Sequence, residues 1–180
     1  MLQLGYNFMP LLCPIEKLKE SRELVICDSE SSRLAHRELF HFSDEVYILA
    51  GEQDNVFDTI LGMVNAFNET PATGPSRIHI VLGWENMLRV SSWKLIRPAL
   101  GDAFILLKNS GVSTQELQPF KTADINDLFP WLYYGKRIDV LRKICHAAKR
   151  QMESRLKNRI IRVDGHLIAN DTKRIVASSL

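Results

Sequence analysis

Short apolar runs alternate with longer stretches of helical period along this chain. The runs that predict strands are apolar nearly throughout, and they are Glu23 to Cys27, Glu45 to Ala50, Arg77 to Leu82 and Ala103 to Leu107. Strands of this kind are covered on both faces, as parallel strands between helices are. The pattern therefore predicts an α/β fold with a mostly parallel sheet and flanking helices, an incomplete P-loop or Rossmann-like arrangement.

Three longer stretches between these runs are long enough for helices of about three or more turns. They are Ser31 to Phe42, Asn55 to Asn68 and Glu85 to Arg97. Asp54 is the expected cap of the second helix, and Pro98 is expected to close the third. The segment Thr70 to Ser76 holds two prolines and a glycine, so it is expected to be an exposed connection.

The last third of the chain changes character. Ile125 to Tyr134 is rich in aromatic residues, and from Lys136 we expect a long amphipathic helix. Its apolar side is formed by Leu141, Cys145, Ala148, Met152 and Leu156.

The final residues predict a small element of their own. Asp164-Gly165 lies between two β-branched runs and is typical of a hairpin turn, and Asn170-Asp171-Thr172 offers a cap for a short terminal helix. We therefore expect an α/β domain over residues 1–158 and a small hairpin or helix element over residues 159–180.

The composition excludes several classes of protein. The chain has 180 residues, of which 46% are hydrophobic and 24% are charged, which argues against a fibrous, collagen-like or wholly disordered protein. No segment approaches the roughly 18 to 20 apolar residues of a membrane-spanning helix, and the first residues lack the basic start of a secretory signal. Cys13, Cys27 and Cys145 are widely spaced and form no CxxC pair, which favours a reducing cytoplasm and no zinc site.

The net charge of +2 conceals an asymmetry. Residues 136–162 hold ten basic and two acidic side chains, whereas residues 1–135 carry a net charge of −6. Such a segment is either a solvated helix face or a contact surface for nucleic acid, an acidic protein or a membrane surface. The candidate anion-binding residues are Lys143, Lys149, Arg150, Arg155, Lys157 and Arg159.

The aromatic cluster and the histidines give weaker signals. Trp131, Tyr133 and Tyr134 either stack on bases or anchor a partner, or they form a hydrophobic plug beneath the basic helix. His36 and His41 are five residues apart, off the spacing that places two ligands on one helix face, so we expect no metal site. His79 lies in an apolar strand and is expected to be a hydrogen-bonded core residue.

Asp28 is the first candidate for chemistry, because it follows directly after a predicted strand in ELVICDSESS. In open α/β sheets, ligands bind outside the carboxyl ends of the strands, so this carboxylate is placed to hold a metal ion or a water molecule. The alternative is that Asp28 or Ser29 caps the following helix.

The order of elements resembles the second half of the ParA/MinD-type P-loop ATPases, including the pilus-assembly relatives CpaE and TadZ. The residues that carry the resemblance are a strand ending in Asp28, a helix, and Ser43-Asp44-Glu45-Val46, which matches the family's turn into its next strand. RIHIVLGWENM takes the place of the strand before the base-binding loop. PWLYYGKRIDVLRKICHAAKRQM is similar to the closing segment, so the resemblance covers roughly Glu23 to Met152.

The family's phosphate-binding loop, of KGGxGKT type, does not occur in the sequence, and Gly83-Trp84 stands where the family often has an asparagine that reads adenine. The resemblance places Asp28 near a magnesium site, but without phosphate ligands it implies a pseudo-ATPase with no cofactor and no catalytic residue. We therefore expect a cytoplasmic adaptor or scaffold that positions or assembles a larger machine through protein–protein contacts, either as a monomer or as a homodimer. The alternatives are a nucleic-acid-binding protein that uses residues 136–162, and a small α/β enzyme with Asp28 as an acid or metal ligand.

Overall fold

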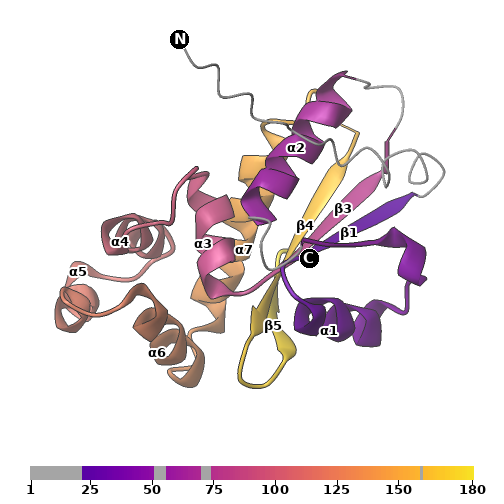
Figure 1. Ribbon diagram of the computed structural model, residues 1–180. Helices are drawn as coiled ribbons and strands as arrows, with labels where there is room; N and C mark the ends of the chain where they lie inside the picture. Colours follow the sequence, from indigo (N-terminus) through magenta and orange to yellow (C-terminus); the bar gives the residue numbers. More distant parts are fainter. Residues whose placement is uncertain (1–21, 51–55, 70–73, 159) are drawn as a thin grey trace, which may run out of the picture.

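The computed structural model describes residues 22–50, 56–69, 74–158 and 160–180, and these form one five-stranded sheet with helices on both faces (Figure 1). The strands are β1 (Glu23–Cys27), β2 (Tyr47–Leu49), β3 (Arg77–Leu82), β4 (Arg162–Ala169) and β5 (Arg174–Ser178). Their spatial order is β2-β1-β3-β4-β5, and the β4–β5 pair is antiparallel while the other three pairs are parallel. The predicted α/β fold with a mostly parallel sheet is confirmed, and it is Rossmann-like.

The strand order contains one reversal of direction. From β1 the chain moves to β2 on one side, and it then crosses back to place β3 on the other side of β1. In doubly wound sheets this reversal is the topological switch point, where the loops after the two central strands diverge and leave a crevice. The switch point of this sheet lies between the carboxyl ends of β1 and β3.

The helices are named as follows. The longer ones are α1 (Glu30–Phe40), α2 (Val56–Glu69), α3 (Trp84–Ser92), α4 (Leu100–Asn109) and α7 (Ile138–Glu153), and the shorter ones are α5 (Thr114–Leu117) and α6 (Leu128–Tyr134). Single 3-10 turns are η2 (Asp44–Val46), η3 (Gln118–Phe120) and η4 (Ile125–Asp127). In Figure 1, α1 covers one face of the sheet and α2, α3 and α7 cover the other, with α4 to α6 on their outer side.

Alternate residues of the strands point to opposite faces of the sheet and pack in two separate hydrophobic cores. Leu24, Ile26 and Ile80 point with their neighbours into the larger core, beneath α2, α3 and α7. Val25, Cys27 and Val81 point to the α1 face and form a smaller cluster. All five predicted apolar positions of the basic helix, from Leu141 to Leu156, are buried in the larger core, as expected.

Ala103 to Leu107 was predicted as a strand, and this was wrong, because the segment lies inside α4. Ala103 and Leu107 are its two buried residues, one helical turn apart, while Ile105 between them is 60% exposed. The carboxylate of Asp102 accepts a hydrogen bond from the backbone N–H of Ala99 and so caps the first turn. Five apolar residues in a row do not distinguish a short buried strand from a helix.

The predicted hairpin turn at Asp164-Gly165 was also wrong, because both residues lie in the middle of β4. The turn instead follows β4, so Asn170-Asp171-Thr172 does not cap a helix but leads into β5. A Cβ on Gly165 would stand 3.0 Å from the carbonyl oxygen of Cys145, so glycine here lets α7 approach the sheet. Most of residues 159–180 thus supply the fourth and fifth strands of the sheet.

Other boundaries also differ from the sequence prediction, such as the start of the second strand, which is at Tyr47 rather than Glu45. The third helix ends at Ser92 rather than at Pro98, because Trp93 adopts a left-handed conformation with a φ of 51°. Lys136 also has a positive φ, of 58°, so the basic helix begins at Ile138. Asp54, Cys13 and most of the connection that starts at Thr70 lie outside the described residues.

Candidate functional site

A shallow cavity of about 420 Å³ lies at the switch point. Asp28 and Ser29 reach it from the end of β1, and Gly83 and the first turn of α3 reach it from the end of β3. Its lining residues are Asp28, Ser29, Gly83, Trp84, Glu85, Asn86, Asn126 and Asn170. Asp28 is therefore where the sequence predicted it, at the sheet edge where α/β proteins bind ligands.

The carboxylate of Asp28 is held by three hydrogen bonds from the protein. Its Oδ1 accepts from Ser32 Oγ at 2.6 Å, and its Oδ2 accepts from the backbone N–H of Gly83 at 2.7 Å and from Asn86 Nδ2 at 2.9 Å. A carboxylate offers about four acceptor positions, so most of them are occupied. Asp28 thus joins α1 and α3 at the carboxyl end of the sheet.

Ser29 is the N-cap of α1, since its hydroxyl accepts a hydrogen bond from the backbone N–H of Ser32. Capping at this loop was one of the two roles that the sequence left open. Asp28 supports the same turn through the Ser32 hydroxyl and also binds the N-terminal end of α3. A carboxylate at a helix N-terminus is further stabilised by the helix dipole.

The electrostatics of the switch-point cavity do not favour an anion. Asp28 and Glu85 are its two ionisable lining residues among those the structure describes, and both are acidic. Three amide side chains, Asn86, Asn126 and Asn170, supply both donors and acceptors. This lining suits a neutral hydrogen-bonding ligand or a cation better than a phosphate, which requires Lys, Arg or a run of free backbone N–H groups.

The candidate anion-binding residues do not form one continuous surface. Lys149 pairs with the buried carboxylate of Asp164, with 3.2 Å between Nζ and Oδ1, and Arg77 approaches the same carboxylate at 3.5 Å. Arg155 stacks over the ring of Trp93 at 4.1 Å and donates to the side chain of Gln151. These two cations thus have partners within the fold.

The remaining candidates differ in their surroundings. Lys157 is exposed, and its backbone N–H donates to the side chain of Asn68. Arg159 lies outside the described residues. Lys143 and Arg150 are exposed and stand seven residues apart on one face of α7, and Lys143 Nζ donates to the carbonyl oxygen of Ser110.

Lys143 and Arg150 line a second cavity, of about 400 Å³, between α3, α4 and α7. His146 lies between them on the same face of α7, and the described lining contains no acidic residue. The full described lining is Ser91, Leu106, Asn109, Ser110, Lys143, His146, Ala147, Arg150 and Gln151. The structure therefore gathers two of the six basic candidates around a hollow that carries positive charge.

The three aromatic candidates also differ in how far they are buried. Trp131 and Tyr133 are partly buried against the larger core, where Trp131 contacts Phe120 and Tyr133 stacks on Phe129. Tyr134 is 68% exposed, and its hydroxyl donates to Asp171 at 2.7 Å. Packing thus accounts for two of the three residues, and Tyr134 is on the surface.

Sequence reasoning missed the three asparagines of the switch-point cavity. Asn86 is in the first turn of α3, Asn126 in η4, and Asn170 follows β4, so they are far apart in the sequence and meet only in the fold. The signal for Asn86 was available, since it stands four residues after β3 ends at Leu82.

The buried thiols have no catalytic environment. Cys27 and Cys145 are free and buried, and burial raises the pKa of both thiols, that of Cys145 to about 12. A thiol that stays protonated at neutral pH is a poor nucleophile and metal ligand. The expected burial of Cys145 on the apolar side of the basic helix is confirmed, and Cys27 is buried as well.

Comparisons with protein-family models, with curated proteins and with solved structures found no match. Among the described helices, none is long and apolar enough to cross a membrane. The fold and the site define an α/β protein of Rossmann-like topology with a polar, acidic cavity at its switch point.

Proposed function

We propose that this protein is a non-catalytic adaptor or scaffold that acts through protein–protein contacts in a larger assembly, as its resemblance to the ParA/MinD-type ATPases implies. One observation carries the proposal. The carboxylate that an ATPase of this type would direct toward magnesium is bound instead by Ser32, Gly83 and Asn86. Asp28 then holds two helices and the sheet together.

The charge of the cavity beside Asp28 supports the same conclusion. A bound nucleotide triphosphate needs cations or a nest of backbone N–H groups around its phosphates. The described lining offers two carboxylates and three amides instead. An ATP molecule placed here would meet like charge rather than compensation.

Apolar side chains on the surface supply contact area for a partner. Leu95 and Ile96, in the loop after α3, are 67% and 76% exposed, and Ile105 on α4 is 60% exposed. Lys94 Nζ pairs with Asp102 Oδ1 at 3.3 Å, which ties this loop to the first turn of α4. Exposed apolar residues that gather in one region are typical of interaction sites.

A site-specific cross-linking experiment tests the adaptor role. A photoreactive amino acid replaces Ile96 in the full chain, and Lys121, exposed elsewhere on the surface, is replaced in the matched control. We expect one protein, identified by mass spectrometry from the native cell, to be cross-linked reproducibly from position 96 and not from position 121. Equal or absent cross-linking from both positions contradicts the proposal.

A second candidate function is nucleic-acid binding through α7. The cavity lined by Lys143, His146 and Arg150, with no acid among its described lining residues, is the observation that favours it. Lysine and arginine bind backbone phosphates without regard to sequence. This binding weakens at higher salt, because the release of counterions from the nucleic acid is then less favourable. Arg150 is the residue whose replacement tests this alternative.

A further inference from the structure

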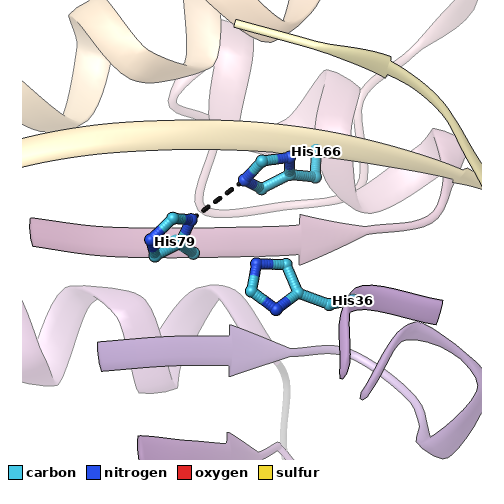
Figure 2. Close-up of side chains that lie close together, drawn as sticks. All are labelled: His36, His79 and His166. Atoms are coloured by element: carbon cyan, nitrogen blue, oxygen red, sulfur yellow. Dashed lines mark hydrogen bonds between the residues drawn. The ribbon is translucent and has the colours of Figure 1, made fainter. Parts of the chain in front are cut away.

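Three histidines from three different elements meet between the sheet and α1. His36 comes from α1, His79 from β3 and His166 from β4 (Figure 2). All three are at most 1% exposed. They lie on the face of the sheet opposite α7, away from both cavities described above and unused by the proposed function.

One nitrogen from each ring points into the cluster. These three atoms lie within 4.8 Å of one another, and the gap between His79 Nδ1 and His166 Nε2 is 3.0 Å. Two nitrogens that each lie about 2.05 Å from a tetrahedral zinc ion are about 3.3 Å apart. The separation of this pair therefore already approaches that of two ligands on one ion.

The other nitrogen of each ring has its own hydrogen-bond partner. His79 Nε2 bonds Glu23 Oε2 at 3.1 Å, His166 Nδ1 bonds Ser178 Oγ at 2.8 Å, and His36 Nδ1 bonds the Tyr47 hydroxyl at 3.0 Å. Metal-binding histidines almost always place an acceptor on the nitrogen that faces away from the ion, because this fixes the ring and its tautomer. All three histidines have such an acceptor, and that of His79 is a carboxylate.

His36 Nε2 is the decisive atom. It is buried, and no hydrogen-bond partner for it exists among the described residues. Figure 2 shows this side of the His36 ring facing His79 and His166. Leaving a buried polar atom unpaired costs about 1 to 3 kcal/mol, so a purely structural hydrogen-bond network does not explain why a histidine stands here.

The cluster lies in apolar surroundings on its α1 side. The rings of Phe40 and Phe42 pack against the cluster, with centroids 5.2 Å from His166 and 5.5 Å from His79 respectively. A neutral imidazole in an apolar shell is a typical ligand of zinc and its neighbours in the first transition row.

We propose that His36, His79 and His166 bind a divalent transition-metal ion, Zn²⁺ being the ion that fits best. His36 Nε2, His79 Nδ1 and His166 Nε2 are the ligand atoms. The change from the metal-free state needs no loss of protons. His166 transfers its proton from Nε2 to Nδ1, where Ser178 Oγ accepts it, while His79 keeps its proton on Nε2 toward Glu23.

The bound ion would join α1 to two strands of the sheet. Such a link stabilises the folded state in proportion to how strongly the ion binds it over the unfolded chain. Because the cluster is buried, the ion enters as the chain folds or when α1 opens. The experiment therefore supplies the metal during refolding.

The full chain is unfolded in denaturant with a chelator, freed of metal, and refolded with one equivalent of Zn²⁺ or of Co²⁺. After desalting, we expect about one zinc ion per chain by elemental analysis and a higher thermal unfolding midpoint than without metal. Co²⁺ should give the intense visible absorption of a low-coordinate nitrogen site. Zinc below about a tenth of an ion per chain, or no Co²⁺ absorption, overturns the proposal.

Two variants separate this cluster from other metal-binding groups. His36→Phe removes one ligand but keeps a ring stacked on Phe40, from which His36 is now 4.3 Å away between centroids. We expect this variant to retain at least about tenfold less zinc than the unmodified chain. His41→Asn is the control, since His41 is exposed at the end of α1 and has a φ of 54°, which asparagine tolerates. Undiminished zinc in a folded His36→Phe variant contradicts the proposal, and if that variant does not fold, the Co²⁺ spectrum of the unmodified chain decides.

Discussion

The backbone N–H of Gly83 donates a 2.7 Å hydrogen bond to Oδ2 of Asp28, and this bond joins the carboxyl ends of β1 and β3. The same oxygen accepts from Asn86, and the other carboxylate oxygen accepts from Ser32. The topology brings Asp28 to the place where an α/β protein holds its ligand, and the neighbouring residues make it a structural link.

Replacement of Asp28 should therefore reduce stability. Asp28→Ala removes the acceptor of three hydrogen bonds at a partly buried position, and we expect the free energy of unfolding to fall by about 1 to 3 kcal/mol. Urea denaturation followed by circular dichroism measures the change. Glu38→Gln, at an exposed position of α1, is the control and should change stability by less than about 0.5 kcal/mol. An Asp28→Ala variant as stable as this control would contradict the structural role.

Two glycines should respond in opposite directions to the same substitution. Gly165→Ala places a Cβ 3.0 Å from the Cys145 carbonyl oxygen, so the backbone of α7 must shift slightly away from β4, and we expect a loss of about 1 to 3 kcal/mol. A Cβ on Gly62, inside α2, would have no neighbour within 4 Å, so Gly62→Ala should stabilise by about 0.5 to 1 kcal/mol. Thermal unfolding of both variants measures these two changes in stability. A neutral Gly165→Ala would mean that α7 is not held against β4 as described.

Lys149 should contribute to stability rather than to anion binding. Lys149→Met leaves the buried carboxylate of Asp164 with Arg77 as its remaining cation, and we expect a loss of about 1 to 3 kcal/mol. Arg142→Met, at an exposed position of the same helix, serves as the control and should be nearly neutral. Denaturant titration of both proteins at equal salt gives the comparison. Equal stability of the two variants would show that the Lys149–Asp164 pair contributes nothing.

Arg150 should determine any affinity for nucleic acid. If α7 binds backbone phosphates, Arg150→Glu weakens binding of a labelled DNA duplex and lowers the slope of log affinity against log salt by about 1 or more. Fluorescence anisotropy at several salt concentrations measures both quantities. Lys121→Glu makes the same charge change at an exposed position outside α7 and should leave the slope unaltered. Identical slopes for the two variants remove the nucleic-acid alternative.

Much of the α/β architecture was predictable because its strands are apolar over their whole length. β1 and β3 are buried on both faces, and runs such as ELVIC and RIHIVL are typical of that environment. The run AFILL is equally apolar but lies in α4. Its two buried residues, Ala103 and Leu107, are four positions apart, as expected for one face of a helix. Composition alone does not separate these cases, since the difference depends on what packs around the segment.

The prediction of a turn at Asp164-Gly165 was wrong because tertiary contacts outweigh the local preference of these two residues. Asp-Gly favours a hairpin locally, but here Gly165 gives room to the backbone of Cys145, and Asp164 pairs with Lys149 and Arg77. Neither interaction is visible in the local sequence.

The candidate site was predicted only in part for a similar reason. Asp28 was found because it follows an apolar strand, whereas Asn126, Asn170 and the three clustered histidines come together only when distant segments fold. His79 was predicted as a hydrogen-bonded core residue, and its bonds to His166 and Glu23 confirm this. Its two histidine neighbours lie 43 or more positions away in the sequence, on α1 and β4.

The central claim is that the switch-point cavity does not support nucleotide chemistry. Calorimetric titration of the full chain with ATP and Mg²⁺, followed by a phosphate-release assay, tests it most directly. We predict no saturable heat at millimolar nucleotide and no release of phosphate above the rate without protein. Saturable MgATP binding with hydrolysis that is lost in Asp28→Asn would contradict the account.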